Sequence, residues 1–599
     1  MPLAALKNVF GYDRFRPGQH DIIQAILDGA HVLAVMPTGA GKSMCFQIPA
    51  LVLGGLTIVV SPLVALMEDQ VAALKLAGVE AETINSSRSR DSNVAAWRRV
   101  ASGQTRLLYL APERLMTARM IAALQRLPVR LIAIDEAHCL SRWGPSFRPE
   151  YESLTRLGEL FLGVPIAALT ATADAATQRD IVDKLFAGAG KVFVSGFDRP
   201  NIHLAVDART ERNRQLLDIV RAHPGESGIV YCLSRDKTEK TARLLCENGY
   251  RALPYHAGMD AAERTHHQKI FMDAPGVIIV ATIAFGMGID KPDVRFVAHT
   301  DMPGSVEAYY QEIGRAGRDG EAATAHMIYG LDDVRMRRMF IEQENTADDH
   351  KQREHKRLDA LIGYCETPGC RRQTLLAYFG ETTAPCGNCD MCLNPPELHD
   401  ASDSARIALG AVEQSGQIYG AAHIIDIVRG AKTQKITSAG HHALAAYGAG
   451  AETPKERWRS ILRQMTGAGF LRLDVAGYGG LAITSKGRDL MAGTEIFQCR
   501  VERHGITAQN RKTNGKTSGV LADLNDEERA LFDALKSLRR ELAHERGVPA
   551  YAVFTDRTLA EMARKKPTDI DAFSRIHGVG VSKVRDFAAT FLGEIAHAE

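Results

Sequence analysis

The chain has 599 residues, with 73 Lys and Arg against 71 Asp and Glu and a formal net charge of +2. This length is several times that of an ordinary domain, so we expect about three to five domains. Hydrophobic residues make up 45% and charged residues 24%, which is typical of a globular protein and excludes wholesale disorder. The near-neutral charge excludes a strongly basic protein that coats nucleic acid, but it allows local basic surfaces.

The first residues and the longest uncharged stretch argue against membrane insertion. MPLAALKNVFGYDR lacks the cationic start and apolar core of a signal peptide. Ser43–Met67 is uncharged and long enough to span a bilayer, but its internal Gly54, Gly55 and Pro62 predict a helix, a turn and a buried strand instead. Ten cysteines are too sparse for a disulfide framework, so we expect a cytoplasmic protein in a reducing compartment.

Short β-branched runs alternate with helical stretches from about residue 30 to 345. The clearest predicted strands are His31–Met36, Thr57–Val60, Leu107–Leu110, Leu131–Ile134, Ile229–Cys232, Val277–Ala281 and Phe296–Thr300. Strands that alternate with helices indicate parallel sheets with crossover helices. The region is too long for one sheet, and the FDRPN segment (Phe197–Asn201) marks its natural break. We therefore predict two α/β lobes in tandem, at 1–200 and 201–345.

Four further segments follow these lobes. A cysteine-containing segment occupies 346–398, and a small mixed α/β module with a hairpin at Phe470–Thr484 occupies 399–499. Residues 500–522 are basic, rich in small polar residues and without apolar periodicity, which predicts a flexible linker. Residues 523–599 are predicted to be helical throughout, because the stretch LFDALKSLRRELA places apolar residues three and four apart.

The predicted strand HVLAVM runs into PTGAGKS and then into a helix. Gly39 and Gly41 would let backbone N–H groups approach phosphate oxygens at the helix N-terminus. Lys42 would reach the β- and γ-phosphates, and Ser43 would coordinate Mg²⁺. The first glycine of the general phosphate-loop pattern is replaced by Met36, so a chance match is the alternative for this loop alone.

An acidic pair supplies the second half of a nucleotide site. Asp135 and Glu136 follow the apolar strand Leu131–Ile134, where one carboxylate can hold Mg²⁺ and its neighbour can orient the attacking water. A solvated turn is the alternative, but an upstream phosphate loop favours an ATPase.

Two arginines in QEIGRAGR, Arg315 and Arg318, suit an arginine finger that stabilises charge on the γ-phosphate. If the second lobe supplies the finger to a nucleotide on the first lobe, hydrolysis is coupled to lobe closure. Surface arginines beside glycines are the alternative, and Arg318 is our choice for the finger.

Six motifs occur in the order of the superfamily 2 helicase set. They are PTGAGKS, SPLVALMEDQ (Ser61–Gln70), DEAH, LTATA (Leu169–Ala173), ATIAFGMGIDKPDVR (Ala281–Arg295) and QEIGRAGRDG (Gln311–Gly320). Together with LKNVFGYDRFRPGQ (Leu6–Gln19), they resemble the RecQ DNA helicases over nearly the whole chain.

The resemblance implies a complete architecture and activity. The expected fold is two tandem RecA-like lobes, a zinc-binding helical subdomain, a winged helix and a small all-helical HRDC domain. The expected activity is ATP- and Mg²⁺-dependent translocation, 3′-to-5′ on single-stranded DNA, with unwinding of duplex or branched DNA in recombination and repair. Gln19 is expected to contact adenine, and the resemblance adds Arg16, Thr38 and Gln311 to the nucleotide site.

An aromatic-rich loop, CLSRWGPSFRPEY, follows DEAH. Aromatic residues interleaved with arginine stack on bases and neutralise phosphates, so Trp143, Phe147 and Arg148 are candidate DNA contacts. Rings that fold back into the core are the alternative. The loop departs from the RecQ pattern at Arg142 and at Pro145-Ser146, which puts the strength of ATP-to-DNA coupling in question.

Tyr255–Gly258 resembles a family element that binds the DNA backbone, which makes His256 a further candidate DNA contact. Judged from the residues alone, a structural role for His256 is favoured.

Four cysteines at metal-ligand spacing predict a structural Zn²⁺ site: Cys370, Cys386, Cys389 and Cys392. Four free thiols are the alternative, and Pro396 stands where a ferredoxin-type cluster would need another cysteine. Cys365 is a rival fourth ligand, but Cys370 fits the CRR position of the RecQ zinc subdomain better.

Two C-terminal modules carry further resemblance. Gly416–Thr484 resembles the RecQ winged helix, which docks on duplex DNA, and Asp523–Glu599 resembles the HRDC domain. Within the latter, GVGVSK resembles a helix-hairpin turn whose backbone amides could meet phosphate. Phe587 stands where the family often has a base-contacting tyrosine, so that contact is in question.

The expected partners are single-stranded and branched or duplex DNA, with single-strand-binding protein and recombination proteins as further candidates. We expect a monomer in the bacterial nucleoid. The alternatives are an RNA-directed helicase, a non-catalytic annealing scaffold, and a DNA-stimulated translocase or remodeller that does not unwind processively.

Overall fold

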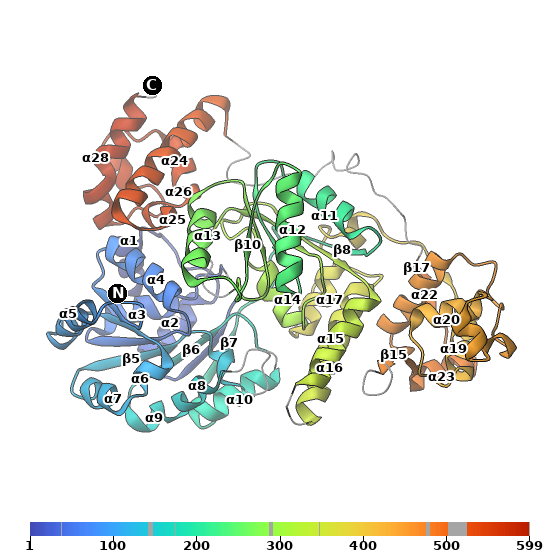
Figure 1. Ribbon diagram of the computed structural model, residues 1–599. Helices are drawn as coiled ribbons and strands as arrows, with labels where there is room; N and C mark the ends of the chain where they lie inside the picture. Colours follow the sequence, from blue (N-terminus) through green and yellow to red (C-terminus); the bar gives the residue numbers. More distant parts are fainter. Residues whose placement is uncertain are drawn as a thin grey trace.

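The computed structural model describes residues 1–37, 39–141, 148–173, 175–286, 291–344, 346, 348–474, 480–500 and 524–597. The chain forms two sheet-containing lobes, a helical segment, a small mixed module at the far end and a helical module that returns to the first lobe (Figure 1). The predicted linker at 501–522 lies outside the described residues. Arg500, which we expected to begin it, instead ends a strand.

Lobe 1 is a seven-stranded sheet in the order β3-β4-β2-β5-β6-β1-β7, and every pair in it is parallel. Its strands are β1 Val32–Val35, β2 Leu56–Val60, β3 Ala81–Ile84, β4 Leu107–Leu110, β5 Val129–Ile134, β6 Ile166–Thr170 and β7 Lys191–Val194. Its longer helices are α1 Pro2–Phe10, α2 Gln19–Leu27, α3 Met44–Leu53, α4 Val64–Leu76, α5 Arg90–Ala101, α7 Ala118–Leu124 and α10 Ala175–Phe186. The uncharged stretch Ser43–Met67 therefore contains α3 and the buried β2, as predicted.

Both faces of this sheet are buried. Along β1, Leu33 and Val35 enter one hydrophobic core, and the alternating Val32 and Ala34 enter another. A strand whose side chains are buried on both faces reads as a continuous apolar run, which is why HVLAVM predicted it.

Lobe 2 is a six-stranded parallel sheet in the order β10-β11-β9-β12-β13-β8. Its strands are β8 Ile202–Ala208, β9 Ser227–Tyr231, β10 Arg251–Tyr255, β11 Val277–Ala281, β12 Val294–His299 and β13 Ala323–Tyr329. Its helices are α11 Arg212–Arg221, α12 Arg235–Glu247, α13 Ala261–Asp273 and α14 Val306–Ile313. The connector Phe197–Asn201 joins the two sheets, as the break at FDRPN predicted.

A helical segment covers β8, the edge strand of lobe 2. It comprises α15 Leu331–Gln343, α16 Asp348–Glu366, α17 Arg371–Tyr378 and α18 Asp390–Leu393. Cys389 forms a β-bridge with Leu204, and the Val206 N–H donates to Asp390 at 3.1 Å. The edge is therefore capped by the segment that carries the cysteine cluster.

The small mixed module contains the hairpin β15 Leu471–Asp474 and β16 Gly480–Ile483, which pair antiparallel as predicted. Its other elements are β14 Leu398–Asp400, α19 Ser402–Gln414, α20 Ala421–Val428, α21 Gln434–Ser438, α22 Lys455–Gly467, α23 Ser485–Met491 and β17 Gln498–Arg500. Buried Glu366 at the end of α16 pairs with Arg463 and Arg500, which joins this module to the cysteine-bearing segment.

The C-terminal module is helical, as predicted: α24 Asp526–Arg546, α25 Ala550–Val553, α26 Asp556–Lys565, α27 Ile570–Ser574 and α28 Val581–His597. It packs on α1 and α4 of lobe 1 (Figure 1). The described residues include no helix long and apolar enough to cross a membrane.

Candidate nucleotide site, zinc centre and DNA-contacting surface

The phosphate loop connects β1 to α3. Gly39 and Gly41 have φ values of 85° and 80°, which other residues rarely adopt. Lys42 Nζ donates to the Met36 carbonyl at 3.3 Å, and burial lowers the pKa of Lys42 while Glu136 and Asp135 oppose that effect. Thr38 lies outside the described residues. The predicted loop thus places its lysine among the acidic residues of DEAH.

Asp135 and Glu136 follow β5 directly. Burial and the Glu136 charge raise the pKa of Asp135 to about 7, whereas Lys42 acts in the opposite direction. Glu136 has φ 51°, a conformation that costs energy for a residue with a side chain. Two adjacent carboxylates that are both partly buried are unfavourable when ionised, so a divalent cation fits this position.

Residues of two other sequence motifs in lobe 1 form hydrogen bonds with the phosphate loop. Gln19 Nε2 donates to the carbonyls of Ala40 and Gly41 at 3.1 and 2.9 Å, and the Arg16 N–H donates to Gln19 Oε1 at 2.9 Å. Gln70, the last residue of SPLVALMEDQ, donates to Ser43 Oγ at 3.2 Å. The N-terminal motif therefore touches the phosphate loop itself.

Lobe 2 reaches this site through α14 and the turn after it. Gln311 Nε2 donates to Thr172 Oγ1 at 2.6 Å, which links QEIGRAGR to LTATA across the two lobes. Arg318 Cγ would lie 4.0 Å from a methyl group placed on Gly39. Arg315 is buried within lobe 2, where it lies beside Tyr231 and Gly286. Of the two arginines, Arg318 is the one that faces the phosphate loop.

Three of the predicted DNA contacts, Trp143, Phe147 and Arg148, belong to the aromatic-rich loop of lobe 1. Trp143 and Phe147, together with Arg142, Pro145 and Ser146, lie outside the described residues. Arg148 Nη1 donates to the Pro62 carbonyl at 3.3 Å on lobe 1.

His256, the fourth predicted DNA contact, lies within lobe 2. It is buried, its Nε2 lies 3.1 Å from Glu239, and its Nδ1 accepts the Gly258 N–H at 3.2 Å. Both ring nitrogens are therefore engaged within lobe 2, and the side chain has a structural position.

A groove of about 560 Å³ lies at the carboxyl ends of the lobe 2 strands. Its lining is Leu233, Ser234, Arg235, Asp236, Ala257, Thr282, Ile283 and Ala284. Ser234 caps α12, so the N–H groups of a helix N-terminus border the groove. Such a border suits a phosphate backbone.

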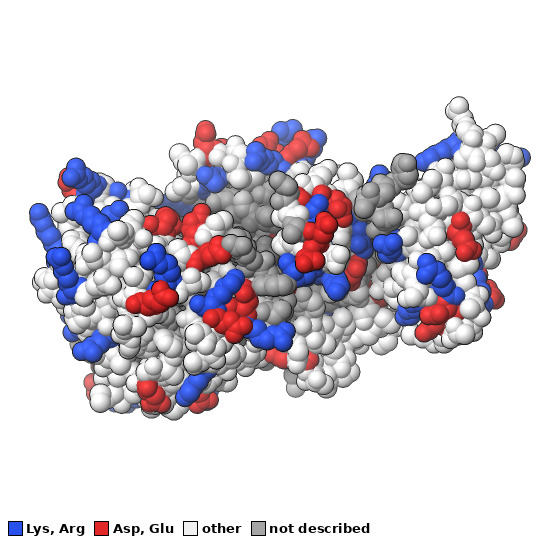
Figure 2. All heavy atoms as spheres, turned by 90° about the horizontal axis from the view of Figure 1, so that it is seen from below, with Lys and Arg blue, Asp and Glu red and all other residues white. Residues whose placement is uncertain are grey.

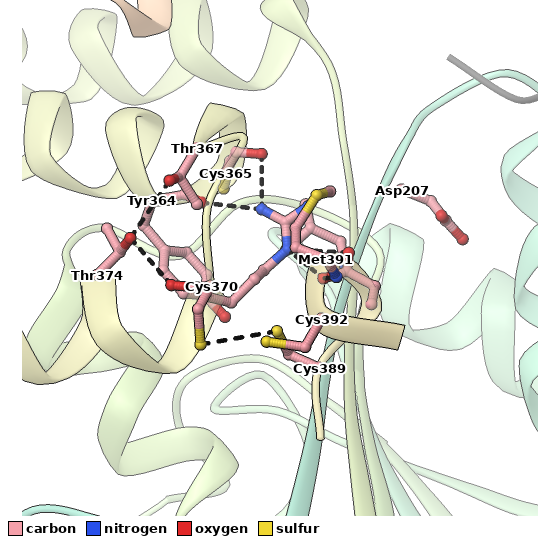
Figure 3. Close-up of polar contacts among 12 residues, drawn as sticks. Asp207, Tyr364, Cys365, Thr367, Cys370, Thr374, Cys389, Met391 and Cys392 are labelled. Carbon is pink, nitrogen blue, oxygen red and sulfur yellow. Dashed lines mark hydrogen bonds and ion pairs between the residues drawn. The ribbon is translucent and has the colours of Figure 1, made fainter. Parts of the chain in front are cut away.

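Four cysteine sulfurs form a compact cluster. The Sγ atoms of Cys370, Cys386, Cys389 and Cys392 all lie within 4.8 Å of one another. The separations between Cys370 and Cys389 and between Cys386 and Cys392 are 3.9 Å, close to the spacing of about 3.8 Å that four Zn–S bonds of 2.3 Å require in a tetrahedron. Cys365 lies apart from Cys370, Cys389 and Cys392 (Figure 3). Its thiol is 3.6 Å from the Met327 sulfur. The predicted choice of Cys370 over Cys365 therefore agrees with the geometry.

The GVGVSK turn lies against lobe 1. The Gly578 N–H donates to the Gly11 carbonyl of lobe 1 at 2.8 Å. A Cβ on Gly580 would lie 2.2 Å from the Val9 oxygen, so the two backbones are in direct contact. The turn therefore docks on lobe 1. Phe587 is buried in the module's own core and so offers no ring to DNA.

Positive and negative side chains are interspersed in small groups over the face in Figure 2. This distribution agrees with the net charge of +2. DNA contacts on such a face depend on individual groups rather than on one extended basic field.

Family models match successive parts of the chain. They are described as DEAD/DEAH box helicase (16–181), helicase conserved C-terminal domain (211–320), RecQ zinc-binding (331–393), RQC domain (395–507) and HRDC domain (528–595). The chain is 42% identical to the ATP-dependent DNA helicase RecQ of Haemophilus influenzae, with 99% of this chain and 95% of that protein covered. It belongs to the RecQ family.

Other RecQ relatives align over similar lengths. The ATP-dependent DNA helicases RecQ of Pasteurella multocida and Bacillus subtilis are 39% and 36% identical, over 98% of this chain and 93% and 97% of their own lengths. The zinc-binding, RQC and HRDC matches coincide with the cysteine-bearing segment, the small mixed module and the helical C-terminal module of this RecQ family member. The predicted order of domains is thereby confirmed.

Three residues of the site were not predicted as site residues. Gln70 and Thr172 lie within SPLVALMEDQ and LTATA, and their positions in these motifs were the available signal. Arg199 belongs to FDRPN, which marked only a lobe boundary, and its place in the site depends on the turn after α14.

Proposed function

We propose that this chain is an ATP- and Mg²⁺-dependent DNA helicase that translocates 3′-to-5′ on single-stranded DNA and unwinds duplex or branched DNA in recombination and repair. The observation that carries the proposal is the 2.6 Å hydrogen bond from Gln311 of lobe 2 to Thr172 of lobe 1. This bond joins the lobes near the acidic pair, so a change at the γ-phosphate would alter lobe closure. The names of the relatives supply DNA as the substrate.

Each residue of the nucleotide site has a proposed role. Lys42 and the amides of the loop that contains Thr38, Gly39 and Gly41 bind the phosphates, Gln19 binds adenine, and Arg16 contributes to the nucleotide site beside the loop. Glu136 orients the attacking water, and Arg318, with Arg315 behind it in lobe 2, stabilises the γ-phosphate. Ser43 and Asp135 would hold Mg²⁺, whose charge would offset that of the phosphates.

DNA would run along the lobe 2 groove and past the aromatic-rich loop of lobe 1. Trp143 and Phe147 stack on bases in this proposal, and Arg148 contacts the backbone. The winged helix docks on the duplex. Zn²⁺ on the four cysteines would hold α17 and α18 together, which is a structural role because no coordination position is left for substrate.

We further propose that the protein acts as a monomer in the cytoplasm, associated with the nucleoid. Single-strand-binding protein and recombination proteins are the proposed partners. Analytical ultracentrifugation with and without tailed DNA tests the monomer, and a dimer under both conditions would contradict it.

The alternative function is a DNA-stimulated ATPase that moves on DNA without processive unwinding. The replacements at Arg142, Pro145 and Ser146 favour this alternative, since they alter the loop that couples strand binding to hydrolysis.

Strand separation on matched duplexes with a 3′ or a 5′ single-stranded tail tests both proposals. With ATP and Mg²⁺, we expect unwinding of the 3′-tailed duplex alone and its loss in Lys42→Ala. ATP hydrolysis on DNA without opening of either duplex would replace the helicase proposal with the translocase.

A further inference from the structure

The connector between the lobes is tied to the turn that carries the two arginines. Arg199 Nη1 donates to the Gly314 carbonyl at 3.3 Å, and its Nη2 donates to the carbonyls of Ala316 and Gly317, both at 2.9 Å. Asn201 Nδ2 also donates to the Gly317 carbonyl, at 2.8 Å. Four hydrogen bonds therefore join the connector to the turn.

The Arg199 guanidinium also faces the phosphate loop. A methyl group placed on Gly39 would lie 3.6 Å from Arg199 Nη1 and 4.0 Å from Arg318 Cγ. Arg16 Nη1 donates to the Gly39 carbonyl from the other side. The guanidinium groups of Arg199 and Arg16, together with the aliphatic part of Arg318, thus lie around the glycine of a loop built to bind phosphate.

Such a cluster of like charges is unfavourable by itself. Burial lowers the pKa of Arg199 to about 10, with Arg318 and Arg16 contributing in the same direction and Tyr310 and Asp319 opposing them. A polyanion bound at the loop would attract these arginine side chains and so offset the repulsion between them. The chemistry of the cluster therefore matches the triphosphate of a nucleotide.

We propose that Arg199 contacts the terminal phosphate of bound ATP and makes the site discriminate between nucleoside triphosphate and diphosphate. The inference rests on the proposed ATPase function. It adds a third arginine to Arg315 and Arg318, and this arginine belongs to the connector rather than to either lobe. Because Arg199 is bonded to the turn that bears Arg318, its contact with phosphate fixes that turn at the same time.

The cysteine-bearing segment holds the connector in place from the opposite side. The Phe197 ring stacks on Phe379 with centroids 4.4 Å apart, and the Phe197 N–H donates to Glu381 at 2.5 Å. Arg372 pairs with Asp198 at 3.1 Å. Arg199 is thus positioned by contacts of the residues that precede it, which keeps its guanidinium at the loop.

Nucleotide binding to the full-length chain tests the proposal. Dissociation constants for a fluorescent ADP and a fluorescent non-hydrolysable ATP analogue are measured for Arg199→Ala, Arg199→Lys and the exposed Arg126→Ala as the matched control. Loss of a charge-assisted hydrogen bond weakens binding by roughly tenfold to a hundredfold. We expect this loss for the ATP analogue with Arg199→Ala, a change of less than about twofold for ADP, and partial recovery with Arg199→Lys.

The conservative variant Arg199→Lys distinguishes a contact with phosphate from a purely structural role. Lysine keeps the positive charge but cannot form all three hydrogen bonds to the carbonyl groups. If the role of Arg199 were purely structural, Arg199→Lys would therefore bind the ATP analogue as weakly as Arg199→Ala. Equal weakening of ADP and the ATP analogue, or wild-type affinity for both, would overturn the proposal. Thermal unfolding confirms that each variant is folded. DNA-stimulated ATP hydrolysis by the wild type is measured separately. Failure of the proposed ATPase function is thereby distinguished from failure of the Arg199 proposal.

Discussion

Arg315 and Arg318 are neighbours in QEIGRAGR but face different surroundings. Arg315 is enclosed by lobe 2 beside Tyr231, whereas Arg318 approaches Gly39 of lobe 1. The sequence could predict that arginines occur in this turn, because their spacing around glycines is visible. It could not assign them, because the assignment depends on how the turn lies between the two lobes.

We expect Arg318→Ala to lower the kcat of DNA-stimulated ATP hydrolysis by roughly 10³-fold or more, since an arginine finger stabilises transition-state charge. Arg315→Ala should instead lower the melting temperature, because it empties a buried position. Steady-state kinetics and thermal unfolding of both variants check this. A kcat loss confined to Arg315→Ala, with its stability unchanged, would reverse the assignment.

A buried histidine pair makes the winged helix sensitive to pH. His423 Nε2 lies 2.8 Å from His441 Nδ1, and His423 stacks on Tyr419 with centroids 4.1 Å apart. Burial, then His441 and Lys435, lower the pKa of His423 to about 4, against a weak opposing effect of Asp426. Between pH 6.5 and 4 the unfolded chain binds a proton at this position that the folded chain does not, so stability is lost as pH falls.

We expect the winged helix to lose about 1–2 kcal/mol of stability between about pH 7 and pH 4.5 through this pair, after allowance for screening by solvent. Trp458 is buried in that module and is one of three tryptophans, so its fluorescence reports the module once Trp97 and Trp143 are replaced by Phe. Urea unfolding followed at the two pH values gives the difference. In His423→Phe the dependence should flatten, and an unchanged slope would show that other groups cause it.

At the scale of elements, the strands and the hairpin were predictable because each follows from local pattern. Apolar runs predicted the sheet strands, and the alternation around GYGG predicted the β15–β16 pair. The triad of Glu366, Arg463 and Arg500 was not predictable, because three charged residues far apart in the sequence read as surface residues until α16, α22 and β17 bring them together.

The cysteine-bearing segment allows a prediction with an internal control. Cys389→Ser should abolish zinc binding, because it removes one of four converging thiolates, whereas Cys365→Ser should retain one zinc per chain. Zinc content by elemental analysis checks both.

The same segment contacts the connector through Phe379 and Glu381. The zinc-free variant should therefore also lose most DNA-stimulated ATP hydrolysis. Zinc loss in Cys365→Ser with zinc retained in Cys389→Ser would instead restore Cys365 as the ligand.

At the scale of the molecule, the HRDC module is docked on lobe 1. Gly580 meets the Val9 carbonyl, and the Tyr12 and His577 rings lie 5.0 Å apart. The glycines of GVGVSK were visible in the sequence, but their partner was not, because close backbone approach suits a phosphate and a neighbouring helix equally well.

We expect Gly580→Ala to detach the module and increase the radius of gyration, because the added methyl group would overlap the Val9 oxygen. Gly593→Ala in the same module is the matched control, since a methyl group there meets nothing within 4 Å. Small-angle X-ray scattering compares the two with the wild type. An unchanged radius of gyration in Gly580→Ala would mean that the contact adjusts without release.

Docking of the HRDC module also affects how a truncated protein would behave. Leu76 of lobe 1 packs against the hydrophobic core of the module, and Ser582 lies against Gly78. A truncated protein that ends before residue 524 would therefore uncover apolar surface on lobe 1, next to the segment that leads to Arg16 and Gln19. Activity differences between full-length and truncated proteins would then combine the loss of the module with structural changes near Arg16 and Gln19. Point variants at Gly580 would separate the two effects.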